Sequence, residues 1–577
     1  MARLVIDPVT RIEGHLRVEV QVDGSRVTEA YSSCTMWRGI ETIVQGRDAR
    51  DAWLFAQRIC GVCTTVHALA SVRAVEDAIG AVPPLNARLL RLIIAAAQYV
   101  QDHVVHFYHL QALDWVDPTS ALKADPAKTA TLAQSISDYP RSTATLFASV
   151  QHRLKAFLAS GNVGPFTNGY WGHSAYRLSP ELNLLAISHY LDALDFQREY
   201  ARVKALIGGK DPHPQTYVVG GMASPIDLNS QDAINDNTMQ ELSQLLQSGQ
   251  NFVQQVYLPD LYAIAAGYPE WTKYGGGLTS YMAFGDYSTS PPRHHHPPSD
   301  GLFPGGVIRA GSLAVQPFDP AGVAEEVAHS WYHYNGAANG GGAGAALPPW
   351  QGETMPDYTG PEPPFDQLDV AGKYSWLKAP RYEGTAVEVG PLARMLVGYA
   401  SGDPRIKPLV QGALNKLKAQ PPALMSTLGR VLARGLETQL VAQYSTELLG
   451  QLRSNVAGGD LAIADTSKWQ PSSWPAGPSR GVGFHEGPRG TLSHWVVVEN
   501  GHIRNYQAIA PTTWNASPRD ARGKPGAYEA ALIGTPVADP KRPLEILRTL
   551  HSFDPCMACA AHIYDADGRD IIKVRVQ

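Results

Sequence analysis

The chain has 577 residues, a formal net charge of −5 at pH 7, and only 18% charged residues. This balance, without a dense Lys/Arg tract, argues against a nucleic-acid partner, and no apolar run approaches the ~18 residues that a membrane span needs. The N-terminal stretch MARLVIDPVT has no charged segment followed by an apolar one, so we expect no signal peptide.

Two hairpins are predicted, one near each end of the chain. Residues 16–22 alternate between apolar and polar side chains, Asp23-Gly24 follows, and a second apolar run starts at Val27. Alternation on both sides of Asp-Gly predicts a β-hairpin. Residues 495–507 repeat the pattern around Asn500-Gly501.

Most of the sequence between these hairpins has helical periodicity. Pro83-Pro84 precede apolar residues at helical spacing, and this pattern stops near Asp117-Pro118. Residues 181–207 and 229–257 are also predicted helices. Together with the two hairpins, the pattern predicts a mainly α fold with a β-rich periphery (α+β).

The first long helix carries His103, His106 and His109 beside Asp102. We interpret the three as hydrogen-bonded histidines near a subunit interface rather than as a separate metal site.

Residues 285–380 are rich in Gly and Pro, and long ordered loops are expected there. The tract His294 to His296, flanked by prolines, is interpreted as a solvated loop. The stretch NGGGAGA at 339–345 has no strand before it, so it is interpreted as a turn rather than a phosphate-binding loop.

Four of the five cysteines form two C-x-x-C motifs, RICGVCTTVH at 58–67 and DPCMACAAH at 554–562. Asp554-Pro555 is typical of a helix start, with Asp554 as the capping residue, and Cys60, Cys63 and His67 also suit the first turns of a helix. Helix N-termini lower the pKa of a thiol, so four thiolates are expected. Sulfur ligands select zinc, iron–sulfur clusters or nickel.

Spacing alone leaves alternatives open. A structural zinc site with four cysteines is common, but zinc ribbons usually close over ~20 residues, whereas these two motifs lie at opposite ends of the chain. Ferredoxin-type iron–sulfur proteins place three cysteines close together. The fifth cysteine, Cys34, has no partner in the sequence and is predicted to be a buried, small apolar residue.

The two cysteine motifs resemble those of the large subunit of nickel–iron hydrogenases. Five further blocks resemble the same family: DPVTRIEGHLRVEV (7–20), RGIETIVQGRD (38–48), KAPRYEGTAVEVGPLAR (378–394), EGPRG (486–490) and NYQAIAPTTWN (505–515). The N-terminal and C-terminal blocks are most similar to the membrane-associated uptake group.

The resemblance implies one integrated catalytic unit over residues 1–562 with a multi-helix core. Within it we expect four regions: a β-hairpin region at about 1–50, a helical core at about 51–280, Gly/Pro-rich loops at about 285–380, and a helical and β region at about 381–562.

For the active site, the resemblance implies a nickel–iron centre held by four thiolates. Cys60 and Cys556 would be terminal on nickel, while Cys63 and Cys559 would bridge to an iron that also carries carbon monoxide and cyanide. The implied reaction is the heterolytic cleavage of H2, with the Cys556 thiolate as the first proton acceptor.

The resemblance also implies roles for residues around the metals. Glu13 in RIEGH would carry the proton onward, although by composition alone it would be an exposed carboxylate at the start of a strand. Arg489 would lie over the open face of the metals, oriented by Asp102 and Asp554. Pro488 would shape the same pocket, and His67 would hydrogen-bond a thiolate.

A second metal and a processed tail are also implied. Glu41, His562 and the backbone carbonyl of Ala508 would hold Mg²⁺, a cation that prefers oxygen ligands; by residue type alone Glu41 would be a charge on a helix surface. Residues 563–577 would be a propeptide that a maturation endopeptidase removes by cleavage after His562, once nickel-insertion proteins have acted.

No cysteines remain for electron-relay clusters, so an iron–sulfur small subunit is expected as an obligate partner. A membrane cytochrome or quinone-linked subunit is a further candidate partner. An export signal on the small subunit would place the pair at the periplasmic face of the membrane, with the cytoplasm as the alternative.

Two other functions fit the same family. One is an H2-sensing regulatory subunit, and the other is a nickel-free structural subunit with a four-cysteine metal site. The presence of all four motif cysteines argues against the second.

Overall fold

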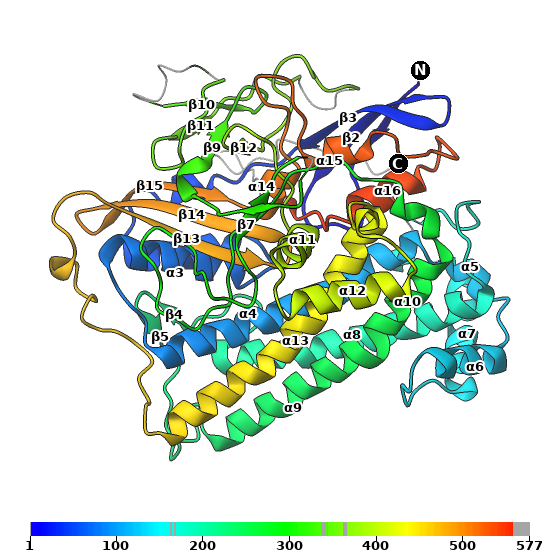
Figure 1. Ribbon diagram of the computed structural model, residues 1–577, viewed down its shortest axis with the longest axis horizontal. Coiled ribbons are helices and arrows are strands. Elements are labelled where there is room, and N and C mark those ends of the chain that lie inside the picture. The colour runs from blue at the N-terminus through cyan, green and yellow to red at the C-terminus, as the bar shows by residue number, and fades with distance from the viewer. Residues whose placement is uncertain are drawn as a thin grey trace.

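The computed structural model describes residues 2–161, 164–166, 169–310, 312–335, 342, 344–361 and 366–557. Two of the predicted ligands, Cys559 and His562, and the predicted propeptide 563–577 lie outside these residues. A group of long helices forms one side of the molecule, and small sheets cover the other (Figure 1). The predicted mainly α fold with a β-rich periphery is confirmed.

Four long helices form the centre of the largest apolar core. They are α4 (Leu85–Val105), α8 (Pro180–Gly208), α9 (Asp236–Phe252) and α13 (Thr427–Ala457). Helix α4 packs against both α8 and α13, and α9 packs against the same two helices. Among the described residues, no helix is both long and apolar enough to cross a membrane.

The predicted helices agree with the structure except at their ends. Helix α9 starts seven residues later than its apolar pattern because Asn235 caps it, accepting a hydrogen bond from the amide of Thr238. Helix α4 ends at Val105 and continues as a π-helical turn over His106–Gln111. The longest helix, α13, begins where Ser426 accepts a hydrogen bond from the amide of Gly429.

Shorter helices connect and flank this group. They are α1 (Ile40–Ile43), α2 (Ala52–Ala56), α3 (Val66–Ile79), α5 (Pro118–Ala121), α6 (Pro126–Ile136), α7 (Ala144–Ala159), α10 (Leu258–Gly267), α11 (Pro391–Ser401), α12 (Ile406–Lys416), α14 (Pro511–Asn515), α15 (Ala527–Leu532) and α16 (Leu544–His551).

Both predicted hairpins are confirmed. Strands β2 (Leu16–Asp23) and β3 (Arg26–Cys34) pair from Leu16↔Cys34 to Asp23↔Arg26, and β1 (Ala2–Ile6) adds a third strand. The second sheet contains β13 (Ser479–Gly487), β14 (Gly490–Glu499) and β15 (His502–Ile509). Its β14–β15 turn places Asn500 and Gly501 at φ values of 52° and 82°, as an Asn-Gly hairpin turn requires.

Residues 285–380 contain short strands as well as loops, so the prediction of loops alone was incomplete. The strands outside the two larger sheets are β4 (Tyr217–Val218), β5 (Gly221–Met222), β6 (Tyr281–Ala283), β7 (Gly306–Ile308), β8 (Val315–Gln316), β9 (Val323–Glu326), β10 (Tyr332–Tyr334), β11 (Thr354–Pro356) and β12 (Ala379–Tyr382). Each of these strands has at most four residues, too few for a periodic signal in the sequence.

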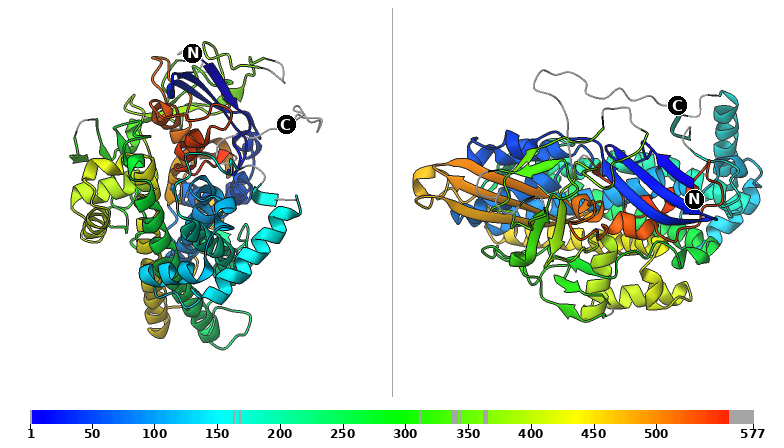
Figure 2. Two further views of the ribbon diagram at one scale, coloured as in Figure 1. Left: turned by 90° about the vertical axis from the view of Figure 1, so that its right-hand side faces the viewer. Right: turned by 90° about the horizontal axis from the view of Figure 1, so that it is seen from above.

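Helix α3 lies directly against the β13–β15 sheet, as the view from above shows (Figure 2). Two glycines of β13 permit this approach. A Cβ atom on Gly481 would lie 2.1 Å from the carbonyl oxygen of Ala74, and one on Gly483 would lie 1.9 Å from that of Ala70. Neither distance is sterically allowed, so glycine and alanine at these positions fix α3 close to the strand that ends near Arg489.

Candidate metal centre

Three of the four motif cysteines lie together in the interior. The Sγ atoms of Cys60, Cys63 and Cys556 are all within 4.8 Å of one another, and all three residues are buried. The Cys60 and Cys556 sulfurs are 3.4 Å apart, which is far longer than a disulfide bond. The structure therefore brings free thiols from both ends of the chain into one cluster; Cys559 lies outside the described residues.

The local backbone differs from the predicted helix start. Cys60 is extended, at φ −131° and ψ 135°, and α3 begins only at Val66, so Cys60 and Cys63 lie in the turn before the helix. In this turn the amides of Val62 and Cys63 donate to the Cys60 sulfur, at 3.3 and 3.1 Å. Such donors stabilise a thiolate, as a helix N-terminus would.

Asp554 is also not an ordinary capping residue. Its φ is 58°, in the left-handed region, whereas a capping residue has an extended backbone. Cys556 forms a β-bridge with Glu13 instead of entering a helix, and the rest of the predicted helix, from residue 558, lies outside the described residues.

Glu13 is joined to Cys556 through both backbone and side chain. The amide of Met557 donates to the Glu13 carbonyl at 2.8 Å, and the Glu13 amide donates to Pro555 at 3.3 Å. The Cys556 thiol donates to Glu13 Oε2 at 3.3 Å. Glu13 is partly buried rather than an exposed carboxylate at a strand start, and it is within reach of the thiol as a proton acceptor.

Arg489 lies in the tight turn between β13 and β14, buried between two carboxylates. Its guanidinium contacts Asp102 at 3.0 Å and Asp554 at 3.1 Å. Burial alone would lower the pKa of Arg489, but the negative charges of Asp554, Cys556 and Asp102 raise it well above its usual range. The guanidinium therefore stays charged, and the predicted pairing with Asp102 and Asp554 is confirmed.

Asp102 is itself part of a polar network behind the cluster. Gln98 donates to Asp102 at 2.6 Å and to the carbonyl of Val62 at 2.9 Å, which links the carboxylate to the cysteine turn. Burial raises the pKa of Asp102 to about 7, against the opposing influence of Arg489 and Lys204.

Arg394, on α11, is a buried positioning residue that the sequence did not reveal. Its guanidinium donates to Glu437 and Glu486 and to the carbonyls of Gly487 and Pro488, at 2.7 to 3.0 Å. These bonds hold the turn that carries Arg489. One signal in the sequence could have revealed it. Arg394 stands beside Leu392 and Met395 in the first turn of an apolar helix, and a charge that is buried there must have buried partners.

His67 lies beside the cluster but has a different partner from the predicted one. Its Nδ1 is 2.9 Å from Nε2 of His494. Burial lowers the pKa of His67 to about 4, so the ring is neutral. His494 in turn is 2.5 Å from the hydroxyl of Tyr506.

The histidines of α4 and the turn after it have separate partners. His103 contacts Glu437, His106 contacts the carbonyl of His551, and His109 contacts that of Tyr190. The interpretation of hydrogen-bonded histidines is confirmed. Cys34 is fully buried, as predicted, and burial raises its pKa to about 12.

A small pocket adjoins the thiol cluster. It is lined by Cys63, Val66, His67, Gly487, Pro488, Arg489, Leu492, Pro511, Thr512 and Cys556. Most of these side chains are apolar, and the charged exception is Arg489. Such a pocket can hold a small uncharged molecule beside one cation and two thiols.

The predicted magnesium ligands are only partly within the described chain. The amide of Ala508 donates to Glu41 Oε1 at 2.8 Å, so these two residues do meet. Glu41 also contacts Lys378 at 3.1 Å, and Lys378 donates to Gln507 at 2.6 Å. Glu41 is therefore not a solvated charge on a helix surface; His562 lies outside the described residues.

The comparisons with known proteins point to one family. A family model described as "Nickel-dependent hydrogenase" matches residues 38–562, and one described as "HoxL-like" matches residues 3–35. The chain is 49% identical to the uptake hydrogenase large subunit of Bradyrhizobium diazoefficiens and 47% identical to the hydrogenase-1 large chain of Escherichia coli K12. Each alignment covers 100% of this chain and 97% of the relative.

A solved structure has the same fold. The oxidized Ni-Fe-Se hydrogenase from D. vulgaris Hildenborough matches with a TM-score of 0.76 at 34% identity, covering 97% of this chain and 100% of that chain.

Proposed function

Because the chain belongs to the nickel-dependent hydrogenase family, we propose that it is the catalytic large subunit of an uptake hydrogenase, which oxidises H2 to protons and electrons. The observation that carries this proposal is the buried cluster of Cys60, Cys63 and Cys556 beside Arg489. The names of the relatives support the uptake direction.

The donor set fits a nickel–iron centre. Three buried sulfurs within 4.8 Å suit a thiophilic metal, and the buried Nε2 of His67 beside them has no hydrogen-bond partner among the described residues. Cys60, Cys63, Cys556 and Cys559 would hold nickel, and Cys63 and Cys559 would also hold the iron with its carbon monoxide and cyanide. When bound, the centre supplies heterolytic cleavage of H2.

The protein's own contribution begins with the proton. The Cys556 sulfur accepts it and passes it to Glu13 Oε2, which lies 3.3 Å away. Glu13 is partly exposed, whereas Cys556 is fully buried, so this transfer leads from the interior toward the surface.

Arg489 supplies a fixed positive charge at the pocket. Asp102 and Asp554 hold its guanidinium in one place, so it orients and polarises what enters without acting as a base. Pro488, next to it, restricts the pocket to small molecules.

We extend the proposal to the remaining partners and processing. Glu41, the Ala508 carbonyl and His562 would hold Mg²⁺; the contact between Glu41 and residue 508 supports this.

Residues 563–577 would be removed after His562 by a maturation endopeptidase once nickel-insertion proteins have acted, and the end of the family match at residue 562 supports that boundary. An intact mass that extends to Gln577 in nickel-loaded enzyme would exclude it.

Electron transfer requires a second subunit. The chain has five cysteines, and four belong to the two motifs, so relay clusters must be carried by an iron–sulfur small subunit. A membrane cytochrome or quinone-linked subunit would accept the electrons, at the periplasmic face of the membrane if the small subunit carries an export signal.

The first experiment is metal analysis and infrared spectroscopy of the purified complex, with H2-dependent dye reduction. We expect nickel and iron together, bands from carbon monoxide and cyanide, and rapid turnover. Zinc alone, without such bands or turnover, would refute the proposal. Bands with very slow turnover would indicate a sensor instead.

Glu13→Gln tests the proton path within the same complex. The amide cannot take up the proton, so turnover should fall at least ~100-fold while metal content and infrared bands stay unchanged. Glu199→Gln, at an exposed position on α8, is the control and should have full activity. Full activity in Glu13→Gln would assign the proton path to another group.

A further inference from the structure

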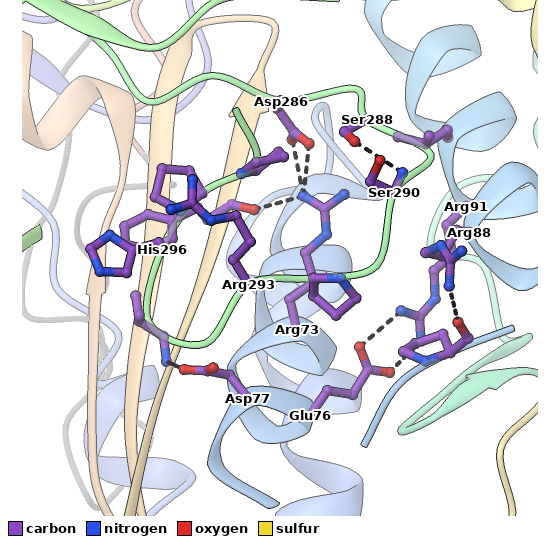
Figure 3. A pocket seen from close by; sticks show the side chains of 17 residues that line it. Arg73, Glu76, Asp77, Arg88, Arg91, Asp286, Ser288, Ser290, Arg293 and His296 are labelled. Atoms are coloured by element: carbon purple, nitrogen blue, oxygen red, sulfur yellow. Dashed lines mark hydrogen bonds and ion pairs between the residues drawn. The ribbon is translucent and has the colours of Figure 1, made fainter. Parts of the chain in front are cut away.

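We propose that a second pocket, on the surface, binds a small organic oxyanion: a carboxylate or phosphate ester carried on an apolar body. We call it the arginine pocket. It is lined by residues of α3, α4, β13 and the loop 286–298, among them Arg73, Arg88, Arg91 and Arg293 (Figure 3). This proposal goes beyond hydrogen oxidation and does not depend on it.

The cavity has the lining of a ligand site. Its volume is about 80 Å³ and it is partly open to solvent, so it has room for a small head group while the rest of a ligand lies along its mouth. Apolar side chains form much of its wall, including Leu92, Val482, Phe484 and Pro298. An inorganic ion would leave this apolar wall without a contact.

The carboxylates in the wall are already occupied by other groups. Both oxygens of Glu76 bind Arg91, at 2.6 and 3.0 Å. Asp77 accepts from the amides of Val482 and His295, at 2.8 and 3.0 Å. Asp286 binds Arg73 and His485. Glu76 and Asp286 therefore pair with Arg91 and Arg73, and both oxygens of Asp77 are taken up by backbone amides.

Three guanidinium groups, by contrast, keep free donors. Arg73 uses only Nη1, for Asp286 and the carbonyl of Phe484. Arg88 uses Nε and Nη1, both for backbone carbonyls. Among the residues that the structure describes, Nη2 of Arg73, Nη2 of Arg88 and the guanidinium of Arg293 make no hydrogen bond or ion pair.

Figure 3 shows Arg73 centrally, with Arg293 on one side and Arg88 and Arg91 on the other. Four arginines face three carboxylates around the cavity, so the lining carries an excess of positive charge. Burial and the neighbouring charge of Arg91 lower the pKa of Arg88, as expected where no anion balances the guanidinium. Guanidinium groups bind carboxylates and phosphates through paired hydrogen bonds, which selects an oxyanion as the ligand's head group.

Isothermal titration calorimetry of the purified large–small subunit complex tests this. Phenyl phosphate and benzoate are the probes, inorganic phosphate lacks the apolar body, and phenol lacks the charge. We expect saturable binding of at least one probe with a Kd below about 1 mM, and at least tenfold weaker binding of phosphate and phenol. Tighter binding of benzoate identifies the head group as a carboxylate, and tighter binding of phenyl phosphate identifies a phosphate ester.

Arg293→Gln and Arg88→Gln should each weaken binding of the probe at least tenfold and leave the rate of H2 oxidation unchanged. Arg293 is exposed, so its replacement does not disturb folding. The control is Arg153→Gln, at an exposed position on α7, away from α3 and β13 (Figure 1). The proposal is overturned if neither probe saturates, if inorganic phosphate binds as tightly, or if the control variant weakens binding equally.

Discussion

One end of α3 and the end of β13 line the metal centre, and more distant parts of the same two elements line the arginine pocket. Val66 and His67, with Gly487, face the thiols, whereas Arg73 and Phe484 face the arginine pocket. Close packing of α3 on Gly481 and Gly483 therefore supports both sites.

The arginines of the two sites differ in burial and in their partners. Arg489, at the metal centre, is almost fully buried and is held by two carboxylates, because a buried cation without a partner would cost several kcal/mol. Arg88 and Arg293 are more exposed, and neither makes an ion pair within 4.0 Å among the described residues, although Arg293 lies near enough to Asp300 to lower the pKa of that carboxyl. The pairing fixes one guanidinium as part of a rigid site, and its absence leaves the others available to a ligand.

The largest effect should come from the thiol cluster itself. Cys556→Ser replaces a soft sulfur by a hard oxygen, so we expect loss of nickel and of all H2-dependent dye reduction. Cys34→Ser changes a cysteine that is equally buried but lies outside the cluster, and it should retain nickel and activity. Nickel content measured by mass spectrometry checks both, and nickel in the first variant would contradict the assignment.

Arg489→Lys should lower kcat about 100-fold with metal content unchanged. A single ammonium group cannot contact Asp102 and Asp554 as the planar guanidinium does. The same substitution in the arginine pocket, Arg293→Lys, should leave kcat within twofold. Equal effects of the two substitutions would remove the contrast between the paired and the unpaired arginines.

Arg394→Lys should lower kcat about tenfold, because the 486–489 turn loses its bonds to the guanidinium. Arg381 is an equally buried arginine that binds Asp520 and several carbonyls, so Arg381→Lys controls for lost stability. If both variants lose thermal stability but only Arg394→Lys loses turnover, Arg394 acts by positioning Arg489. Equal losses of turnover would assign it a purely structural role.

Gly483→Ala should have the smallest effect on turnover and a measurable effect on stability. Its Cβ would collide with the Ala70 carbonyl, so α3 must move, at a cost of roughly 1–3 kcal/mol. Thermal inactivation and probe binding should both change, since both sites rest on α3. Gly450→Ala on α13, where a Cβ meets nothing within 4 Å, should be neutral or slightly stabilising.

Features encoded within a few residues were predictable from the sequence. The Asn500-Gly501 turn and the apolar periodicity of α8 have local signals, and both are found where they were predicted. The two C-x-x-C motifs are equally local, and three of their four cysteines meet in one cluster. The resemblance to a known family added the pairing of Arg489 with two distant aspartates, which no local pattern contains.

Features that depend on packing between distant segments were not predictable. The left-handed backbone of Asp554, the His67–His494 contact and the role of Arg394 each require knowing which segments meet. The late start of α9 has a different origin, since its apolar pattern extended into a loop that the Asn235 cap excludes from the helix.

The pairing of Glu13 with residues 555–557 has a consequence for how the protein is made. The cysteine cluster joins residues from the first and last parts of the chain. During synthesis the N-terminal segment leaves the ribosome long before Cys556 is added. Until then Glu13 lacks its hydrogen-bond partners in residues 555–557. The third thiol reaches the cluster only after Cys556 has been added, so the cluster cannot form while only the N-terminal part of the chain exists.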